Sequence, residues 1–221
     1  MKKLEGKVAL ITGASKGIGE GIARVYAKYG AKLVLAARGE RVLEFAEELR
    51  SQGYDAIGVR ADVTQKESVL ALVKAALDRY GTIDVLVNNA GVCILGDLLT
   101  SSDEDRDAHF DINIKGVWNV TRAVAPIMMM KKEGKIVIMS SVTGDMVADP
   151  GEAAYATSKA ALVGFTKAVA RELADYNITV NAICPGYVLT PMVEGMAKQS
   201  CPENPQSVID GIAAGVPLKR L

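Results

Sequence analysis

The sequence has little of what marks a disulfide-rich or nucleic-acid-binding protein. Its 221 residues include 3 cysteines, 3 phenylalanines and 1 histidine. Cys93, Cys184 and Cys201 form no Cys-x-x-Cys pair, which argues against a disulfide framework and fits a reducing cytosol. Basic and acidic residues are equal at 26 each, so no excess charge attracts nucleic acid or an anionic membrane. We therefore expect a cytoplasmic protein with no nucleic-acid or membrane partner.

Two further absences narrow the possibilities. No apolar run approaches the ~20 residues that a membrane-spanning helix needs. Histidine, cysteine and acidic residues form no cluster with the spacing of metal ligands. The sequence therefore predicts neither a membrane anchor nor a bound metal.

What the sequence does contain is an alternation of short apolar runs with longer helical patterns. The runs VALIT, LVLAA and IVIMS are continuously apolar, as in strands that are buried on both faces. The alternation predicts an α/β fold, a Rossmann-like doubly wound parallel sheet in three α/β/α layers. The expected strands are Lys7–Thr12, Lys32–Ala37, Asp55–Arg60, Val85–Asn88, Lys135–Ser140 and Ile178–Pro185. The expected helices are Gly17–Tyr29, Arg41–Gln52, Gln65–Tyr80, Glu104–Lys131 and Ala153–Tyr176.

No linker or repeat interrupts this pattern before about residue 190, so we expect a single domain over residues 1–221. After residue 190 prolines and glycines become frequent. We interpret residues 192–216 as a mobile helical flap over a substrate site.

A glycine-rich turn, TGASKGIG, follows the first expected strand at Thr12–Gly19. Glycines at a strand-to-helix turn let the backbone approach a ligand, and the helix N-terminus offers free N–H groups to a pyrophosphate. The alternative is a tight turn that binds nothing. The position after the first strand favours a nucleotide site.

A tyrosine and a lysine lie one helical turn apart in the segment YATSK. In a helix, Tyr155 and Lys159 would share one face, with Cβ atoms about 5–6 Å apart. The lysine charge would lower the tyrosine pKa from near ~10 and make the phenol a usable acid–base group. The alternative is a packed tyrosine beside a solvated lysine.

Together these motifs resemble the short-chain dehydrogenase/reductase family. The glycine turn, NNAG at Asn88–Gly91, two serines before YATSK, and Pro185–Gly186 stand in the family's order between residue 7 and about residue 190. The resemblance implies a catalytic tetrad, made of Asn113, Ser141, Tyr155 and Lys159. The interval from Ser141 to Tyr155 is one position longer than is usual in the family, so Ser140 is a rival to Ser141.

The resemblance also implies a role for each member. Tyr155 exchanges a proton with the substrate oxygen, Lys159 lowers its pKa and binds the cofactor ribose, and Ser141 holds the substrate oxygen. Asn113 would hold a helix open for a water that leads to Lys159, or, as the alternative, would cap a local carbonyl.

The cofactor preference depends on the end of the second expected strand. An NAD site has an acidic residue there, but this sequence has Ala37 followed by Arg38, and Lys16 adds a second cation. These residues favour NADP, although each cation alone is also compatible with a solvated surface. The resemblance implies a larger cofactor-binding set, made of Gly13, Ser15, Lys16, Gly17, Ile18, Gly19, Arg38, Asp62, Val63, Asn89, Ala90, Gly91, Tyr155, Lys159, Pro185, Gly186, Val188 and Thr190.

The sequence thus predicts an NADP-dependent oxidoreductase that acts on a small or medium carbonyl or alcohol substrate. The alternatives are a non-redox epimerase or dehydratase on the same fold, and a cofactor-sensing binding protein. His109 is expected to be a packed or surface residue and Cys93 an inert thiol. Apolar residues on several faces of two long helices favour a homodimer or homotetramer.

The C-terminal part departs from the family pattern. Family members continue past the segment that ends here at Leu221, with another helix and a last strand that we expect this chain to lack. We expect the strand Ile178–Pro185 to lie at an uncovered edge, and the natural chain to be longer.

Overall fold

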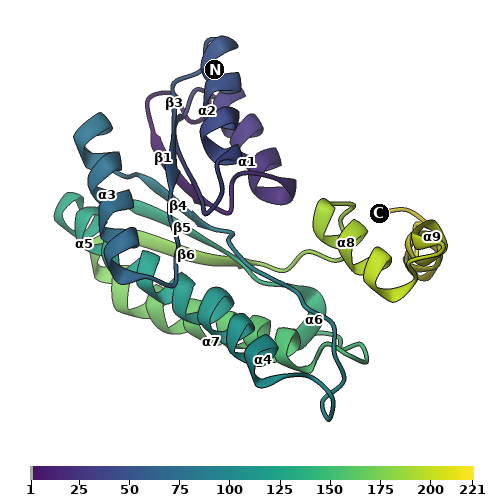
Figure 1. Ribbon diagram of the computed structural model, residues 1–221. Helices are drawn as coiled ribbons and strands as arrows, with labels where there is room; N and C mark the ends of the chain where they lie inside the picture. Colours follow the sequence, from purple (N-terminus) through teal and green to yellow (C-terminus); the bar gives the residue numbers. More distant parts are fainter. Residues whose placement is uncertain (1) are drawn as a thin grey trace.

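A computed structural model describes residues 2–221 and contains one parallel sheet of six strands. Figure 1 shows the sheet between two layers of helices, which confirms the Rossmann-like three-layer fold. The strand order is β3-β2-β1-β4-β5-β6, with the switch point between β1 and β4. The strands are β1 (Val8–Thr12), β2 (Lys32–Ala37), β3 (Ala56–Arg60), β4 (Val85–Asn88), β5 (Gly134–Met139) and β6 (Ile178–Ile183).

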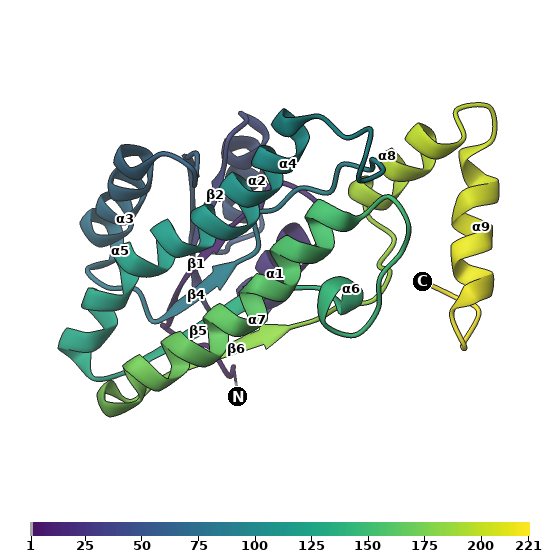
Figure 2. The same ribbon diagram turned by 90° about the horizontal axis from the view of Figure 1, so that it is seen from below.

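The helices cover the two faces of the sheet unequally. Helices α1 (Gly17–Lys28) and α2 (Arg41–Ser51) lie on one face, and α3 (Lys66–Tyr80), α5 (Gly116–Lys131) and α7 (Ala153–Leu173) lie on the other (Figures 1 and 2). A 3-10 turn, Ala174–Tyr176, extends α7 to the predicted end of that helix. None of the helices within residues 2–221 is long and apolar enough to cross a membrane.

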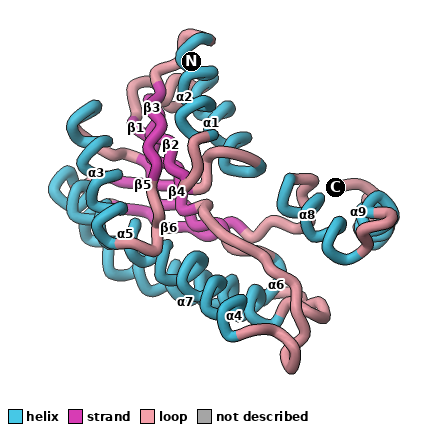
Figure 3. Tube along the Cα trace, viewed as in Figure 1, coloured by secondary structure: helices cyan, strands magenta, loops and turns pink. Residues whose placement is uncertain are grey.

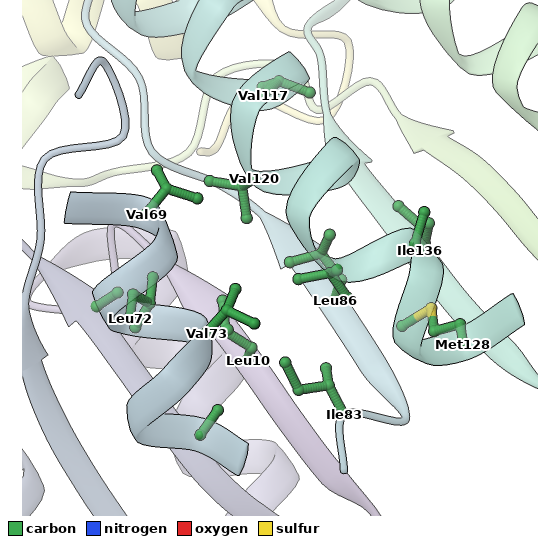
Figure 4. Packing of buried hydrophobic residues seen from close by; sticks show 14 of the residues in the cluster. Leu10, Val69, Leu72, Val73, Ile83, Leu86, Val117, Val120, Met128 and Ile136 are labelled. Carbon is green, nitrogen blue, oxygen red and sulfur yellow. The ribbon is translucent and has the colours of Figure 1, made fainter. Parts of the chain in front are cut away.

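The core divides into two clusters because side chains alternate between the faces of a strand. In β1, Val8 and Leu10 point into the α3–α5–α7 layer, whereas Ala9 and Ile11 point into the α1–α2 layer. Each such fully buried Leu or Ile contributes roughly 1.5–3 kcal/mol. Figure 4 shows the first cluster, in which strand residues pack against α3 and α5: Leu10, Leu86, Ile136, Val69, Leu72, Val73, Val117, Val120 and Met128.

The prediction of one continuous helix over Glu104–Lys131 is wrong in one respect, because the helix is interrupted. It consists of α4 (Asp103–His109), a π-helix (Phe110–Lys115) and α5. A π-helix inserts one extra residue into a turn and is frequent at functional sites. Gly116 follows it directly, and a Cβ there would lie 2.6 Å from Val63. Neither propensity nor periodicity signals such an insertion.

Beyond β6 the chain leaves the sheet and forms two helices that the sequence indicated only as a helical flap. Helices α8 (Pro191–Ser200) and α9 (Pro205–Gly215) lie apart from the sheet, beyond the carboxyl end of β6 (Figures 1 and 3). Within residues 2–221, β6 is an edge strand, as predicted. Thr179, Asn181 and Ile183 are exposed and alternate with buried or half-buried residues. Its face opposite α7 is therefore open.

Candidate active site

The larger of two adjoining pockets, of about 410 Å³, lies at the carboxyl ends of the strands. Each of four strands brings a loop to it: Gly13–Gly17 after β1, Arg38 after β2, Asp62 after β3 and Asn89–Gly91 after β4. In open α/β sheets, ligands bind at this edge, where the strand order reverses.

The glycine turn in this pocket leaves no room for side chains. Gly13 has φ +64°, and a Cβ there would lie 2.8 Å from the Cα of Ala90. A Cβ on Gly19 would lie 2.3 Å from the carbonyl oxygen of Gly13. The Asn89 amide donates to the carbonyl oxygens of Thr12 and Gly13, both at 3.1 Å, and fixes the turn to the loop after β4. No side chain of residues 2–221 caps the N-terminus of α1, so its N–H groups remain available for an anion.

The outer end of the larger pocket carries positive charge. Arg38 and Lys16 are both exposed there, and neither forms a salt bridge within residues 2–221. The nearby Glu40 is paired with Arg60. The Asp62 carboxylate accepts hydrogen bonds from the backbone N and the hydroxyl of Thr64, at 2.9 and 2.8 Å. Two cations are thus free to contact a ligand, while the neighbouring carboxylates have partners.

The structure brings most of the expected cofactor-binding residues into this one pocket. Gly13, Ser15, Lys16, Gly17, Ile18, Arg38, Asp62, Val63, Asn89, Ala90, Gly91, Tyr155, Lys159, Pro185 and Thr190 line it. Gly19 lies behind the turn, and Gly186 and Val188 line a second pocket instead. Among the further residues that line the larger pocket, Ile112 comes from the π-helix and Met192 from α8, and no sequence motif marks either. The glycine cradle and the cations fit a dinucleotide.

Tyr155 and Lys159 meet at the inner end of the larger pocket. Both lie on α7, and the Lys159 Nζ is 5.6 Å from the centre of the Tyr155 ring. Lys159 is buried, and its ammonium donates a hydrogen bond of 2.8 Å to the carbonyl oxygen of Met139. The alternative of a solvated lysine is therefore wrong.

The two candidate serines make different contacts. The hydroxyl of Ser140 donates to the backbone carbonyl of Lys159 at 2.7 Å, which ties the end of β5 to α7. The side chain of Ser141 lies close enough to Tyr155 to lower the pKa of its phenol, and it accepts from the backbone N of Thr143 at 3.1 Å. Only the Ser141 hydroxyl is therefore placed beside the Tyr155 phenol.

The pKa values depart from the expectation that Lys159 lowers that of Tyr155. Burial raises the pKa of Tyr155 to about 12, and the nearby Ser141 side chain only partly offsets the shift. Burial also lowers the pKa of Lys159 to about 8. Both side chains are pushed toward their neutral forms, because a low-dielectric site disfavours either charge. Desolvation therefore outweighs the attraction that a Tyr155 phenolate and a Lys159 ammonium would have for each other.

Asn113 lies in the π-helix and is fully buried. Its amide accepts from the backbone N of Val92 at 2.8 Å, and donates to the carbonyl of Val92 at 3.0 Å and to Ser158 at 2.9 Å. The partners belong to other segments, so the alternative of a local cap is wrong. Asn113 joins the loop after β4 to α7, one residue before Lys159.

His109 and Cys93 are near the site but unsuited to acid–base work. The Nε2 of His109 accepts from the backbone N of Ile94 at 3.1 Å, so the Nδ1–H donates to the carbonyl of Asp105 at 2.7 Å. Both ring nitrogens are used and the ring is buried, which confirms the packed alternative. Burial raises the pKa of Cys93 to about 12, and its thiol is therefore protonated at neutral pH.

The smaller pocket, of about 120 Å³, adjoins the larger one at Tyr155 and Ser140. Its wall comes from the loop after β5, including Asp149 and Glu152, and from the segment of Tyr187 to Met196. Tyr187 donates a hydrogen bond of 3.0 Å to Asp149 across the mouth. A ligand in the smaller pocket would reach the Tyr155 hydroxyl and the larger pocket at once.

Comparison with known families agrees with this geometry. A model of the short chain dehydrogenase family matches residues 7–200. The chain belongs to this family, and it is accordingly an oxidoreductase that binds a nicotinamide cofactor. Oxidoreductase UcpA of Salmonella typhimurium is 60% identical over 221 residues, which are 100% of this chain and 84% of that protein. The 3-oxoacyl-[acyl-carrier-protein] reductase of Synechocystis is 42% identical over 198 residues, which are 89% and 80% of the two chains.

Solved structures show the same fold. Levodione reductase superposes with a TM-score of 0.94 at 33% identity, covering 99% of this chain and 86% of that one. Actinorhodin polyketide ketoreductase with NADPH gives 0.90 at 39%, covering 100% and 85%. NAD⁺-bound xylitol dehydrogenase gives 0.90 at 33%, covering 99% and 88%. Neighbours of this fold thus hold either cofactor.

Proposed function

We propose that the protein is an NADP-dependent oxidoreductase that transfers hydride between the nicotinamide and a small or medium carbonyl or alcohol, with Tyr155 as the acid–base group. The observation that carries this proposal is the junction of the two pockets at Tyr155, with Ser141 and Lys159 beside it. The bound cofactor supplies the hydride donor or acceptor. The chain holds it through the glycine turn, Asn89–Gly91 and the cations at the outer end of the larger pocket.

The protein's own residues handle the substrate oxygen and its proton. In carbonyl reduction, Tyr155 donates its phenolic proton to the oxygen, and the Ser141 hydroxyl hydrogen-bonds the same oxygen while charge develops on it. A tyrosine whose pKa is about 12 is protonated at neutral pH, as a proton donor must be. Lys159 positions Tyr155 and the cofactor ribose, and Asn113 positions Lys159 by bridging Val92 and Ser158.

The preference for NADP over NAD rests on Arg38 and Lys16. The 2′-phosphate of NADP carries a charge that an arginine beside the end of β2 recognises, whereas NAD sites use a carboxylate for the ribose hydroxyl. Ala37 offers no carboxylate, and Glu40 is paired with Arg60. Cofactor discrimination in this proposal is electrostatic.

We further propose that the chain is one domain that works as a homodimer or homotetramer in the cytoplasm. Trp118 lies on α5 with 53% of its surface exposed, and its ring packs on Phe165 of α7 at 5.4 Å between centroids. Burying this face against a second copy is the simplest way to cover it. Light scattering at micromolar concentration tests the assembly, and a monomeric mass would contradict it.

The decisive experiment monitors NADPH absorbance with a panel of ketones, aldehydes and sugars. Carbonyl-dependent loss of NADPH supports the hydride-transfer proposal and excludes a cofactor-sensing binding protein. If no carbonyl is reduced but the enzyme converts an added sugar or alcohol without net change in NADPH, the non-redox alternative is correct.

A further inference from the structure

We propose that Glu152 selects the substrate: the smaller pocket takes an uncharged carbonyl compound that also carries a hydroxyl group, which hydrogen-bonds the Glu152 carboxyl. The inference deepens the proposed hydride-transfer function and depends on it. It rests on a buried carboxyl group that the fold itself leaves incompletely bonded.

Glu152 is unusual among the acidic residues because it is buried. It has 6% of its surface exposed, lines the smaller pocket, and precedes α7 at the N-cap position, three residues before Tyr155. Its Oε2 atom has no hydrogen-bond partner within residues 2–221. An unmatched buried oxygen costs roughly 1–3 kcal/mol, so a sequence selected for stability alone would avoid it. A ligand that donates to this oxygen would remove the cost.

The charges around the smaller pocket favour an uncharged ligand. Glu152 and Asp149 are its ionisable carboxyls, and no lysine, arginine or histidine of residues 2–221 lines it. Asp149 is held at the mouth by Tyr187. An anionic substrate such as a keto acid would meet carboxyl groups with no cation to compensate, and such contacts reject a ligand more strongly than a missing attraction.

A hydroxyl group satisfies the site whatever the protonation state of Glu152. Burial, first, and the nearby Asp149 raise the pKa of this carboxyl, and the Thr143 side chain lowers it by less. A carboxylate accepts from a substrate hydroxyl, and a carboxylic acid can donate to it. The rest of the wall is largely apolar, including Val142, Val147 and Val193, so it suits the carbon skeleton of the substrate.

The test compares three small carbonyl compounds of similar size: hydroxyacetone, butan-2-one and pyruvate. With saturating NADPH, we expect kcat/KM for hydroxyacetone to exceed that for each of the other two by at least about 10-fold, since a buried polar group rejects an analogue that leaves it unpaired. In Glu152→Leu the preference over butan-2-one should fall to within about 2-fold. Glu152→Gln should keep it, because the amide oxygen still accepts.

Asp145→Asn is the matched control, since Asp145 is an exposed carboxylate on the same loop that lines neither pocket. It should leave the preference unchanged. Thermal melting identifies any unfolded variant, and we expect Glu152→Leu to melt at or above the wild-type temperature. Equal kcat/KM for hydroxyacetone and butan-2-one in the wild type, a retained preference in Glu152→Leu, or faster turnover of pyruvate would each overturn the inference.

A binding measurement separates this inference from the proposed function. Quenching of NADPH fluorescence in the enzyme–NADPH complex reports occupancy of the adjoining pocket without turnover. If none of the three is reduced but hydroxyacetone binds at least about 10-fold more tightly than butan-2-one, the Glu152 assignment stands and the hydride-transfer proposal fails. Reduction of all three at equal rates would support hydride transfer and overturn the Glu152 assignment.

Discussion

The larger and the smaller pocket are built from different parts of the chain. The larger pocket has a backbone cradle at its centre, made of the glycines at 13, 17 and 91 and the N-terminus of α1. The smaller pocket is made of side chains from the loop after β5 and from the segment that leads into α8. Where the backbone must approach a ligand closely, only glycine fits, and such glycines can be recognised in the sequence. Where side chains contact the ligand, many residue types are possible at each position. The substrate is therefore harder to predict from the sequence than the cofactor.

The largest expected effect is at Tyr155, the residue that the two pockets share. Tyr155→Phe removes the proton that is donated to the substrate oxygen and should lower kcat by about 100-fold or more. Cofactor affinity, measured by NADPH fluorescence titration, should change little, since the ring that lines the larger pocket remains. The mechanism would be wrong if the variant retained near-normal turnover and Ser141→Ala did too.

The backbone character of the larger pocket is tested at Gly19. Gly19→Ala places a Cβ within 2.3 Å of the Gly13 carbonyl and 2.5 Å of the Asn89 amide, so the glycine turn must move. We expect a loss of about 2 kcal/mol in the free energy of unfolding and at least about 10-fold in cofactor affinity. Urea denaturation and fluorescence titration measure the two.

Gly21→Ala is the matched control in the same helix. A Cβ on Gly21 meets no atom within 4 Å, and alanine is the better helix former by about 1 kcal/mol. The control should be neutral or stabilising. If both variants behaved alike, the turn would not be tightly packed against the loop after β4.

The electrostatic part of the larger pocket is tested at Arg38. We expect NADPH to bind at least about 10-fold more tightly than NADH, equivalent to about 1.4 kcal/mol, and Arg38→Asp to reverse the order by repelling the 2′-phosphate. Lys28→Asp makes the same change of charge at the far end of α1 and should leave both affinities as they are. Equal affinities of the wild type for the two cofactors, by titration, would refute the proposed NADP preference.

The sequence predicted the sheet, its parallel strands and the larger pocket, because each rests on a local pattern. Continuous apolar runs identify buried strands, and the glycine turn fixes the loop after β1. It did not predict the π-helix at Phe110–Lys115, since one inserted residue leaves no trace in periodicity. Nor did it single out Glu152, because burial of a lone glutamate depends on how a loop folds back onto α7.

The pKa values of Tyr155 and Lys159 could not be predicted from the sequence for the same reason. The spacing of Tyr155 and Lys159 in YATSK correctly placed both groups at one site. That spacing predicts the attraction between opposite charges, but the desolvation that outweighs it depends on β5, the loop after β4 and α7 closing together.

The smallest expected effect is on stability at Lys159, and its sign depends on pH. The folded-state pKa is about 8, below the ordinary value of 10.5, so the unfolded chain binds more protons between these values and stability rises with pH there. Below pH 8 the folded protein carries a buried charge that costs on the order of 3 kcal/mol. Lys159→Met removes this cost but leaves the Met139 carbonyl unpaired, at a cost of about 2 kcal/mol.

The variant should therefore be more stable than the wild type by about 1 kcal/mol at pH 7, and less stable at pH 10, where Lys159 is neutral in the folded state and most of its burial cost has gone. Urea denaturation of both proteins at the two pH values measures the crossing. Lys167→Met, an exposed lysine on the same helix, should show none. If the difference in unfolding free energy between Lys159→Met and the wild type stayed constant from pH 7 to pH 10, the site would not lower the pKa of Lys159.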